Sequence, residues 1–417
     1  MLRLIFLRKI LARKHATFHI QNRYHQLQKM KLKFIYLIFI PLILGCETEK
    51  KNIENNLIGE WSKIEKIENN DYPPPLGFNR PFGIGFTEDK IELFNGFRRY
   101  DQDSVTGKRQ LNYKGTFTDY KVKNDSIFIL NPFNKNWDFK WRIKEQLTDT
   151  LILTRNDTIF IKLQRIKQKK DNSFDQIIFS SSGCYGSCPI IDISINNKNK
   201  IYFQGEGYIK PLGFYESLID SIKTDYIFSK FAKANIDSLK KDYAVGHTDD
   251  ESITTTFVKN GQIIKTINDY GKAGPKELIW AYVPIQNLYT EIQLDSLTND
   301  EPFYPKLHYY TFEKDSKILR LEKSESFFLW TEIKDSKIVN TKFNSKYNIG
   351  FRGNYTYWGA DPNEKRKHQY ELDKIESDGK LFKFSFKDQK SITYDLGYNF
   401  IERNFKESDF KKKTKYD

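Results

Sequence analysis

Two cysteines four residues apart are the best-defined chemical groups of this 417-residue chain. Cys184 and Cys188 lie in the segment GCYGSCP at 183–189. A structural disulfide closing such a five-residue loop contributes about 2 kcal/mol in the chain-entropy model. Two alternatives stay open: a redox-active dithiol, and a Cu(I) site in which His247 is the third ligand. We favour the structural disulfide, because an alternating strand follows the pair where a redox cysteine would precede a helix.

His247 begins a short polar segment, His-Thr-Asp-Asp-Glu, that ends at Glu251. Carboxylates are the ligands that a hard cation such as Ca²⁺ prefers, so Asp249 and Asp250 are weak candidates for ligand binding. The segment lacks the acidic spacing and the central glycine of an EF-hand loop. It is typical of a helix-to-strand loop with Asp and Thr turn chemistry, and we predict no metal site.

Motifs of the common enzyme classes are missing from the sequence. It has no Gly-x-Ser-x-Gly elbow, no His-Glu-x-x-His, no P-loop and no Gly-x-Gly-x-x-Gly. Only three histidines follow Cys46, so a histidine-based site has few candidates. Paired carboxylates stay open, because spacing in sequence does not give spacing in a β fold. We favour a non-enzymatic protein without a cofactor, with hydrolysis of an envelope polymer as an alternative.

The third cysteine ends the segment Met30–Cys46. Two lysines precede the apolar run Phe34–Leu44, which is shorter than the about 20 residues of a membrane-spanning helix and fits the apolar core of a signal peptide. The ending Ile-Leu-Gly-Cys resembles the lipobox of bacterial lipoproteins. This resemblance implies cleavage after Gly45 and a lipidated Cys46 that carries diacylglycerol and usually an N-acyl chain such as palmitate. Several acyl chains give stable membrane anchoring. A buried apolar helix that ends in cysteine is the alternative.

Residues 1–29 precede this signal and hold seven Lys or Arg and no acidic residue. We interpret them as an extension from a mis-assigned start, with Met30 as the true start; a long leader is the alternative. Residues 1–45 carry nine of the basic residues, so about +5 of the net charge of +14 remains after them. Such a surplus is typical of a solvated surface rather than of a basic nucleic-acid footprint. We therefore predict no nucleic-acid partner.

The composition favours a mainly β chain, because 25 Tyr, 33 Phe and 6 Trp are typical of strands. Residues 46–56 are polar and are predicted to form a flexible tether. Residues 57–166 are predicted to form a β domain, and about eight short strands are enough for a small up-and-down barrel. The predicted strands after the first lie at 84–87, 90–94, 113–121, 126–130, 138–143, 150–154 and 158–163.

The pattern Gly59-x-Trp61 near the first strand of this region resembles lipocalin-like domains. The resemblance implies a barrel that holds a small apolar ligand, with Trp61 as a weak candidate for contact. The alternative is that Trp61 only plugs one end of the barrel.

Residues 174–294 are predicted to form a central α+β domain after a charged linker at 167–172. Asn260-Gly261 is a strong turn signal between strands at 252–258 and 262–268. Pro275 is placed at the start of a final helix. The other predicted elements are strands at 176–180, 190–195 and 200–204 and one or two amphipathic helices within Tyr215–Leu239.

The segment 183–189 resembles the signature of a domain of unknown function found in bacterial lipoproteins and secreted proteins. Its continuation resembles the same family through Thr248-Asp249, Asp269-Tyr270 and Pro275-x-x-Leu278. The resemblance covers roughly 120 residues and implies no activity.

Residues 301–406 are predicted to form a second β-rich domain, a sandwich or another barrel, and 407–417 a charged tail. The predicted strands lie at 307–313, 317–322, 327–333, 337–343, 347–358, 368–375, 380–386 and 392–396, with a last one near Phe400.

Together these features predict a lipoprotein of the bacterial cell envelope that faces the periplasm or the exterior. Its partners would be the membrane, through Cys46, and a small apolar ligand or an envelope protein. We expect a binding or interaction module, with a thiol-redox or copper-handling role of Cys184 and Cys188 as the alternative.

Overall fold

A computed structural model describes residues 56–64, 81–102, 109–156, 158–167, 174–297, 304, 306–352, 372–387 and 390–414. The leader at 1–45, Cys46 and most of the tether lie outside the described residues. The chain divides into two compact units, one from the described parts of 1–64, 84–91 and 118–165, and one from those of 65–83, 92–117 and 166–417. No helix among the described residues is long and apolar enough to cross a membrane.

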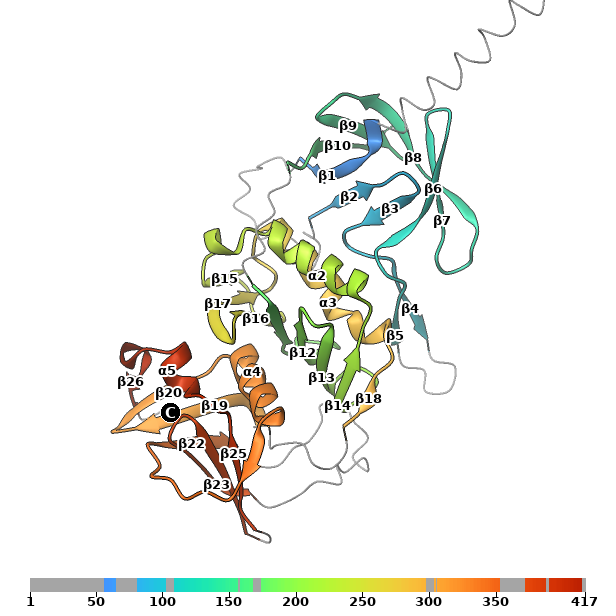
Figure 1. Cartoon of the computed structure of the whole chain (residues 1–417). Helices are drawn as coiled ribbons and strands as arrows, with labels where there is room; N and C mark the ends of the chain where they lie inside the picture. The colour runs from blue at the N-terminus through green and yellow to red at the C-terminus, as the bar shows by residue number, and fades with distance from the viewer. Residues whose placement is uncertain are drawn as a thin grey trace, which may run out of the picture. The chain divides into compact units, whose positions relative to one another are not determined.

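An eight-stranded closed barrel confirms the predicted small barrel (Figure 1). Its strands follow the order β1-β10-β9-β8-β7-β6-β3-β2. Alternation directs Tyr120 and Val122 of β6, and Ile127 and Ile129 of β7, into the buried interior. The strands are β1 (Gly59–Lys63), β2 (Gly83–Phe86), β3 (Lys90–Leu93), β6 (Phe117–Lys123), β7 (Ser126–Leu130), β8 (Trp137–Gln146), β9 (Thr150–Thr154) and β10 (Phe160–Arg165).

Trp61 is fully buried and already has partners in the barrel. Its indole Nε1 donates a hydrogen bond to the carbonyl oxygen of Leu57 at 2.8 Å, and the guanidinium of Arg165 lies 4.2 Å from the ring centroid. Arg165 also donates to the carbonyl oxygen of Ile58 at 2.6 Å. Gly59 has a φ of 127°, and a Cβ there would lie 2.5 Å from Nη1 of Arg165. The Gly-x-Trp pattern therefore has a structural explanation at this position.

A hairpin of β4 (Arg98–Gln102) and β5 (Arg109–Tyr113) was not predicted, because its strands are polar and lack apolar alternation. It belongs to the second unit, within residues 92–117.

A buried ion pair attaches this segment to α2 (Ser221–Lys233). Nζ of Lys230 lies 2.7 Å from Oε1 of Glu92, and both side chains are 6% exposed. Tyr226 donates its hydroxyl to the same oxygen at 2.5 Å. This buried pair fixes the segment onto the helix that carries Lys230.

The central region forms an eight-stranded sheet in the order β15-β17-β16-β11-β12-β13-β14-β18. Two helices and the apolar row Ile177, Phe179, Ile191 and Ile193 share one core on one face of this sheet. The elements are β11 (Gln176–Ser181), β12 (Ile190–Asn196), β13 (Lys200–Gly207), β14 (Gly213–Leu218), α2 (Ser221–Lys233), η1 (Ile236–Ser238), β15 (Asp242–Ala244), β16 (Ser252–Lys259), β17 (Gln262–Tyr270), α3 (Lys276–Gln286), η2 (Leu288–Thr290) and β18 (Asp295–Ser296).

The helix prediction for Tyr215–Leu239 is wrong at its beginning. Residues 215–218 belong to β14 and pair with β13. The helix α2 begins only after Asp220, whose side chain accepts a hydrogen bond from the backbone N–H of Ile222 at 2.7 Å and so caps it.

The C-terminal region forms one eight-stranded sheet in place of the predicted sandwich or barrel, in the order β21-β25-β24-β23-β22-β19-β20-β26. Phe400 begins a short helix where a strand was expected. The elements are β19 (Lys306–Lys314), β20 (Lys317–Arg320), α4 (Lys323–Lys334), β21 (Lys337–Val339), β22 (Tyr347–Arg352), β23 (Leu372–Ser377), β24 (Leu381–Phe386), β25 (Ile392–Asp395), α5 (Phe400–Asn404), η3 (Glu407–Asp409) and β26 (Lys411–Lys412).

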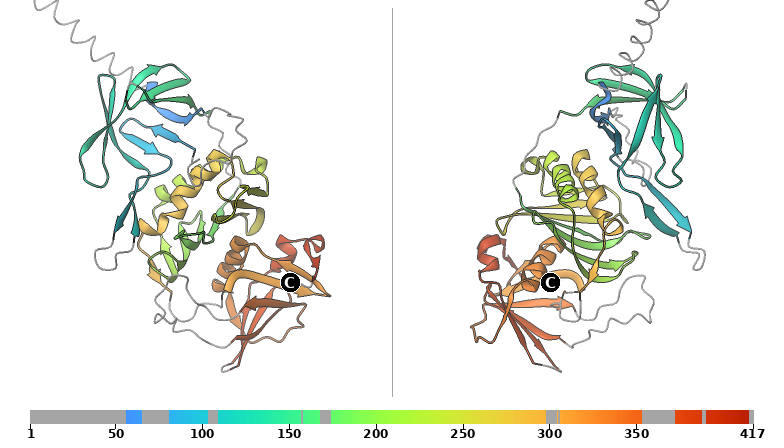
Figure 2. Two further views of the ribbon diagram at one scale, coloured as in Figure 1. Left: turned by 180° about the vertical axis from the view of Figure 1, so that it is seen from behind. Right: turned by 45° about the vertical axis from the view of Figure 1, so that its right-hand side comes forward.

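The strand predicted at Phe327–Ile333 is wrong, because these residues form the helix α4. A capping box between Glu322 and Glu325 begins the helix. It contacts β11, β12 and β16 of the central sheet and β19 of the C-terminal sheet (Figure 2). Both sides of α4 are covered, so ten of its twelve residues are buried, among them Lys323, Ser324 and Glu325. Its apolar residues are therefore not confined to one face, and no amphipathic period identifies the helix.

Candidate functional site

Two loops far apart in sequence meet at one end of the central sheet. The disulfide loop, residues 182–189, follows β11, and the acidic loop, residues 245–251, precedes β16. Antiparallel pairing places Ser181 opposite Ile253, so the two loops leave the sheet side by side. The backbone N–H of Tyr185 donates to the oxygen of Asp249 at 2.9 Å and joins the two loops, and Ser182 N–H donates to the oxygen of Ser252, the first residue of β16, at 2.8 Å.

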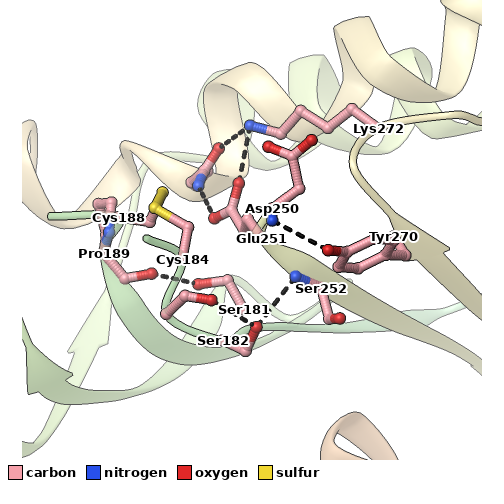
Figure 3. Close-up of a disulfide and its surroundings, with 12 residues drawn as sticks. Ser181, Ser182, Cys184, Cys188, Pro189, Asp250, Glu251, Ser252, Tyr270 and Lys272 are labelled. Carbon is pink, nitrogen blue, oxygen red and sulfur yellow. Dashed lines mark hydrogen bonds and ion pairs between the residues drawn. A yellow bond between two sulfur atoms is a disulfide. The ribbon is translucent and has the colours of Figure 1, made fainter. Parts of the chain in front are cut away.

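The disulfide loop is closed twice. Cys184 and Cys188 form the predicted disulfide, with their Cα atoms 5.6 Å apart. Ser181 donates its hydroxyl to the carbonyl oxygen of Pro189 at 2.7 Å across the base of the loop (Figure 3). Gly186 has a φ of 142°, which favours glycine at this turn. Between the cysteines, the side chain of Tyr185 is 89% exposed. The loop is therefore a closed turn that presents one aromatic ring to solvent.

The acidic loop is ordered by its own side chains. Nε2 of His247 lies 2.6 Å from Oδ2 of Asp250, with both side chains part-buried. The backbone N–H of Asp250 donates to the hydroxyl of Tyr270 at 3.0 Å. Asp249 is exposed and has a φ of 76°, a conformation that Asp tolerates better than most residues. Asp249 thus stays at the surface, and its backbone oxygen accepts the N–H of Tyr185.

The last residue of the acidic loop, Glu251, forms an ion pair with Lys272. Glu251 is 6% exposed, and its Oε2 lies 2.9 Å from Nζ of Lys272. Gln286 of α3 donates its Nε2 to Oε1 of Glu251 at 2.6 Å and accepts from Lys272 at 3.3 Å (Figure 3). The three side chains satisfy one another, which a buried carboxylate requires.

The turn that carries Lys272 is held by Asp269. Its Oδ1 accepts hydrogen bonds from the backbone N–H groups of Ala273 at 2.7 Å and Gly274 at 3.2 Å. Burial raises the pKa of the Asp269 carboxyl above its usual range, while these two donors oppose the rise. The turn leads directly into α3, so the helix, the ion pair and the two loops are parts of one hydrogen-bonded assembly.

Apart from Cys46, the sequence provides six candidate site residues. The structure places five of them on the two loops: the two cysteines, His247, Asp249 and Asp250. Trp61 lies in the barrel and is not among them. Lys272, Gln286 and Tyr270 were not predicted. The Asn260-Gly261 hairpin contained the signal for Tyr270, because its register places that residue opposite Ser252.

An exposed ring and the carboxylate of Asp249 face solvent from loops that are fixed at several points. The His247 imidazole already contacts Asp250, and β12 rather than a helix follows Cys188. Within the described ranges, no group of three or more His, Cys, Asp or Glu side chains is arranged to hold a metal ion.

Comparison with known proteins identifies one family. The model of the domain of unknown function DUF6438 matches residues 175–289, which includes both loops and the helices α2 and α3. No curated protein and no solved structure matches the chain.

Proposed function

We propose that the chain is a membrane-anchored protein of the bacterial cell envelope that binds a partner through the disulfide loop. The observation that carries the binding role is Tyr185, which is 89% exposed at the tip of a loop closed by a disulfide. Large aromatic side chains on fixed loops lose little conformational entropy on binding and dominate many interfaces. The exposure of the Tyr185 ring supports a role in recognition rather than in packing.

The chemistry beside Tyr185 defines what the loop would accept. Asp249 supplies a carboxylate at the junction of the two loops, while Glu251 is already neutralised by Lys272. An exposed aromatic ring and an exposed carboxylate on two loops joined by the Tyr185–Asp249 backbone hydrogen bond can each attract a cationic group, one by cation–π and the other by ionic contact. We infer that the partner presents a lysine, arginine or other ammonium group to this tip.

The anchor is proposed from the lipobox-like ending at Cys46, which lies ten residues before the first described residue. Fractionation of cells that produce the chain or its Cys46→Ser variant tests it. We expect the parent chain in the membrane fraction with an acyl mass on its first peptide, and the variant unacylated. Membrane partitioning of an unacylated variant would contradict the lipid anchor.

The binding role is tested by a photo-crosslinking amino acid at position 185 in living cells. The matched control is position 100, because Tyr100 is also an exposed tyrosine, at 65%, but lies on the β4–β5 hairpin. We expect a discrete light-dependent adduct from position 185 that weakens when Asp249 is changed to Asn. Equal labelling from both positions, or none from position 185, contradicts the proposal.

A further inference from the structure

An aromatic patch lies on the outer face of the barrel, on β7 and β8. It consists of Phe128, Leu130, Trp137 and Phe139, and we call it the aromatic face. Phe139 is 43% exposed and Trp137 is 42% exposed. The rings of Phe128 and Phe139 are 5.9 Å apart, and Leu130 pairs with Trp137 across the two strands.

A β-bulge is what turns these side chains outward. Ile127 pairs with Trp141, but the next residue, Phe128, pairs with Phe139, so Lys140 is left without a partner in the register. Trp141 is 4% exposed and faces the interior. In a regular strand Phe139 would share that side, because side chains alternate with a period of two. The extra residue moves both Phe139 and Trp137 to the outer face.

A basic side chain accompanies the aromatic face. Nζ of Lys121 lies 4.0 Å from the ring centroid of Trp137, and Lys121 pairs with Phe128 across β6 and β7. Trp with nearby Lys is the composition that membrane interfaces favour, because the ring occupies the headgroup level while the ammonium group stays hydrated. The face therefore has the chemistry of a lipid contact.

The distance along the chain to Cys46 supports the same partner. Asn56 lies ten positions after Cys46, and a fully extended chain of that length spans about 36 Å at most. A lipid on Cys46 would hold the barrel within that distance of the bilayer. At such a high effective concentration a weak contact is enough. Four side chains are few for a stable protein interface, which buries about 800 Å² on each partner.

We propose that the aromatic face of β7 and β8 contacts the bilayer to which the chain is anchored, with Trp137 and Phe139 at headgroup level. This inference rests on the proposed anchoring through Cys46. It assigns the barrel a role in holding its own unit against the bilayer.

Fluorescence quenching by brominated lipid tests the contact. The intact lipidated chain is reconstituted in vesicles of phosphatidylethanolamine and phosphatidylglycerol, with and without bromine on the acyl chains. We expect brominated lipid to quench part of the tryptophan emission, and Trp137→Phe to abolish that part. The matched control is Trp141→Phe, which removes a buried ring of the same strand and should leave the quenching intact.

Three other outcomes would each overturn either the lipid contact or the anchor through Cys46. If the chain partitions into membranes through acylated Cys46 but brominated lipid quenches nothing, the lipid contact fails and the anchor stands. Equal quenching in the chain and in Trp137→Phe also refutes the contact at this face. If the chain is not acylated, the anchor fails. Quenching of Trp137 in the unacylated Cys46→Ser chain at a lipid concentration in the millimolar range, on the order of the effective concentration that a short tether provides, then decides the contact by itself.

Discussion

Tyr185 is exposed because the residues on either side of it are fixed. The cysteines next to it in the loop are bonded to each other, and its own backbone N–H is bound to the acidic loop. A side chain on such a turn cannot fold back onto the sheet, so its area stays in water unless a partner covers it. The disulfide therefore fixes the conformation of the loop, and removal of the cysteines should lower the free energy of unfolding.

Replacing both Cys184 and Cys188 by serine should therefore lower the free energy of unfolding by about 2 kcal/mol, the chain-entropy estimate for a five-residue loop. Denaturant unfolding of the parent and the double variant measures this. Intact mass after alkylation without reductant should show no label on either cysteine. Ready labelling after mild reductant, or copper retained by the reduced protein, would instead support the thiol-redox or copper-handling alternative.

The helix α4 connects the central sheet to the C-terminal sheet, because it contacts strands of both. Its first residue, Lys323, is 8% exposed in its side chain, and its Nζ lies 3.5 Å from Oδ2 of the fully buried Asp192. Nζ also donates to the carbonyl oxygen of Ser181 at 2.6 Å. Ser324 adds a hydroxyl contact with Thr256 at 2.8 Å. The helix is thus fixed to the central sheet by polar contacts at its beginning and by apolar packing along its length.

Lys323→Met should destabilise the chain by roughly 3–5 kcal/mol, because it leaves the Asp192 carboxylate buried without its cation. Adding Asp192→Leu to that variant should recover part of the loss, since no charge is then left buried. Lys334→Met, at the other end of α4, is the control and should cost little. A double variant less stable than Lys323→Met would contradict this account. Urea unfolding of the four proteins decides the question.

The acid–base behaviour of α4 should be visible at its capping box. Burial raises the pKa of Glu325, although its carboxylate accepts the backbone N–H of Glu322 at 2.9 Å. The folded chain then holds this proton more tightly than the unfolded chain, so stability falls as the pH rises from the usual pKa of a glutamate through the raised one.

Glu325→Gln should make that fall shallower, because the amide does not titrate. The exposed Glu402→Gln should leave it unchanged. Thermal melts across this pH range compare the slopes; an equal slope in the parent and in Glu325→Gln would show that Glu325 does not contribute to it.

The elements also show what sequence alone could provide. The strand β7 and the Asn260-Gly261 hairpin were predicted correctly, because alternation and turn chemistry are local signals. The strand predicted at 113–121 instead begins at the end of β5 and stops within β6. The helix α4 was predicted as a strand, because burial on both sides removes the helical period from Phe327–Ile333. The disulfide was predictable from spacing. Lys272 and Gln286 were not, because their contact with Glu251 depends on how α3 packs.

At the scale of the whole molecule, the matched family region does not coincide with a folding unit. The match ends at residue 289, yet α4, beyond that limit, covers the second face of the central sheet. Ile178, Tyr202 and Val258 of that sheet belong to the same apolar core as Phe328 and Trp330 of α4. The second unit likewise includes residues 92–117, which precede the match in sequence.

Lys230→Met tests the attachment of that preceding segment. It leaves Glu92 buried with only the Tyr226 hydroxyl, and we expect a loss of roughly 3–5 kcal/mol. Hydrogen exchange should then be faster in both the β4–β5 hairpin and α2. The exposed Lys240→Met is the control. Faster exchange in α2 alone would mean that the pair does not hold the hairpin.

The pairing of Glu92 with Tyr226 also sets a waiting time during synthesis. The two residues are 134 positions apart in the chain, so at about 5–20 residues per second the tyrosine is made roughly 7–27 seconds after the glutamate. Throughout that interval Phe94 lacks the ring of Trp280, which packs 4.8 Å from its own and is made later still. During synthesis the chain thus contains the apolar side chain of Phe94 before the helices α2 and α3 are made. The segment around Phe94 is therefore a site where a holding chaperone can bind.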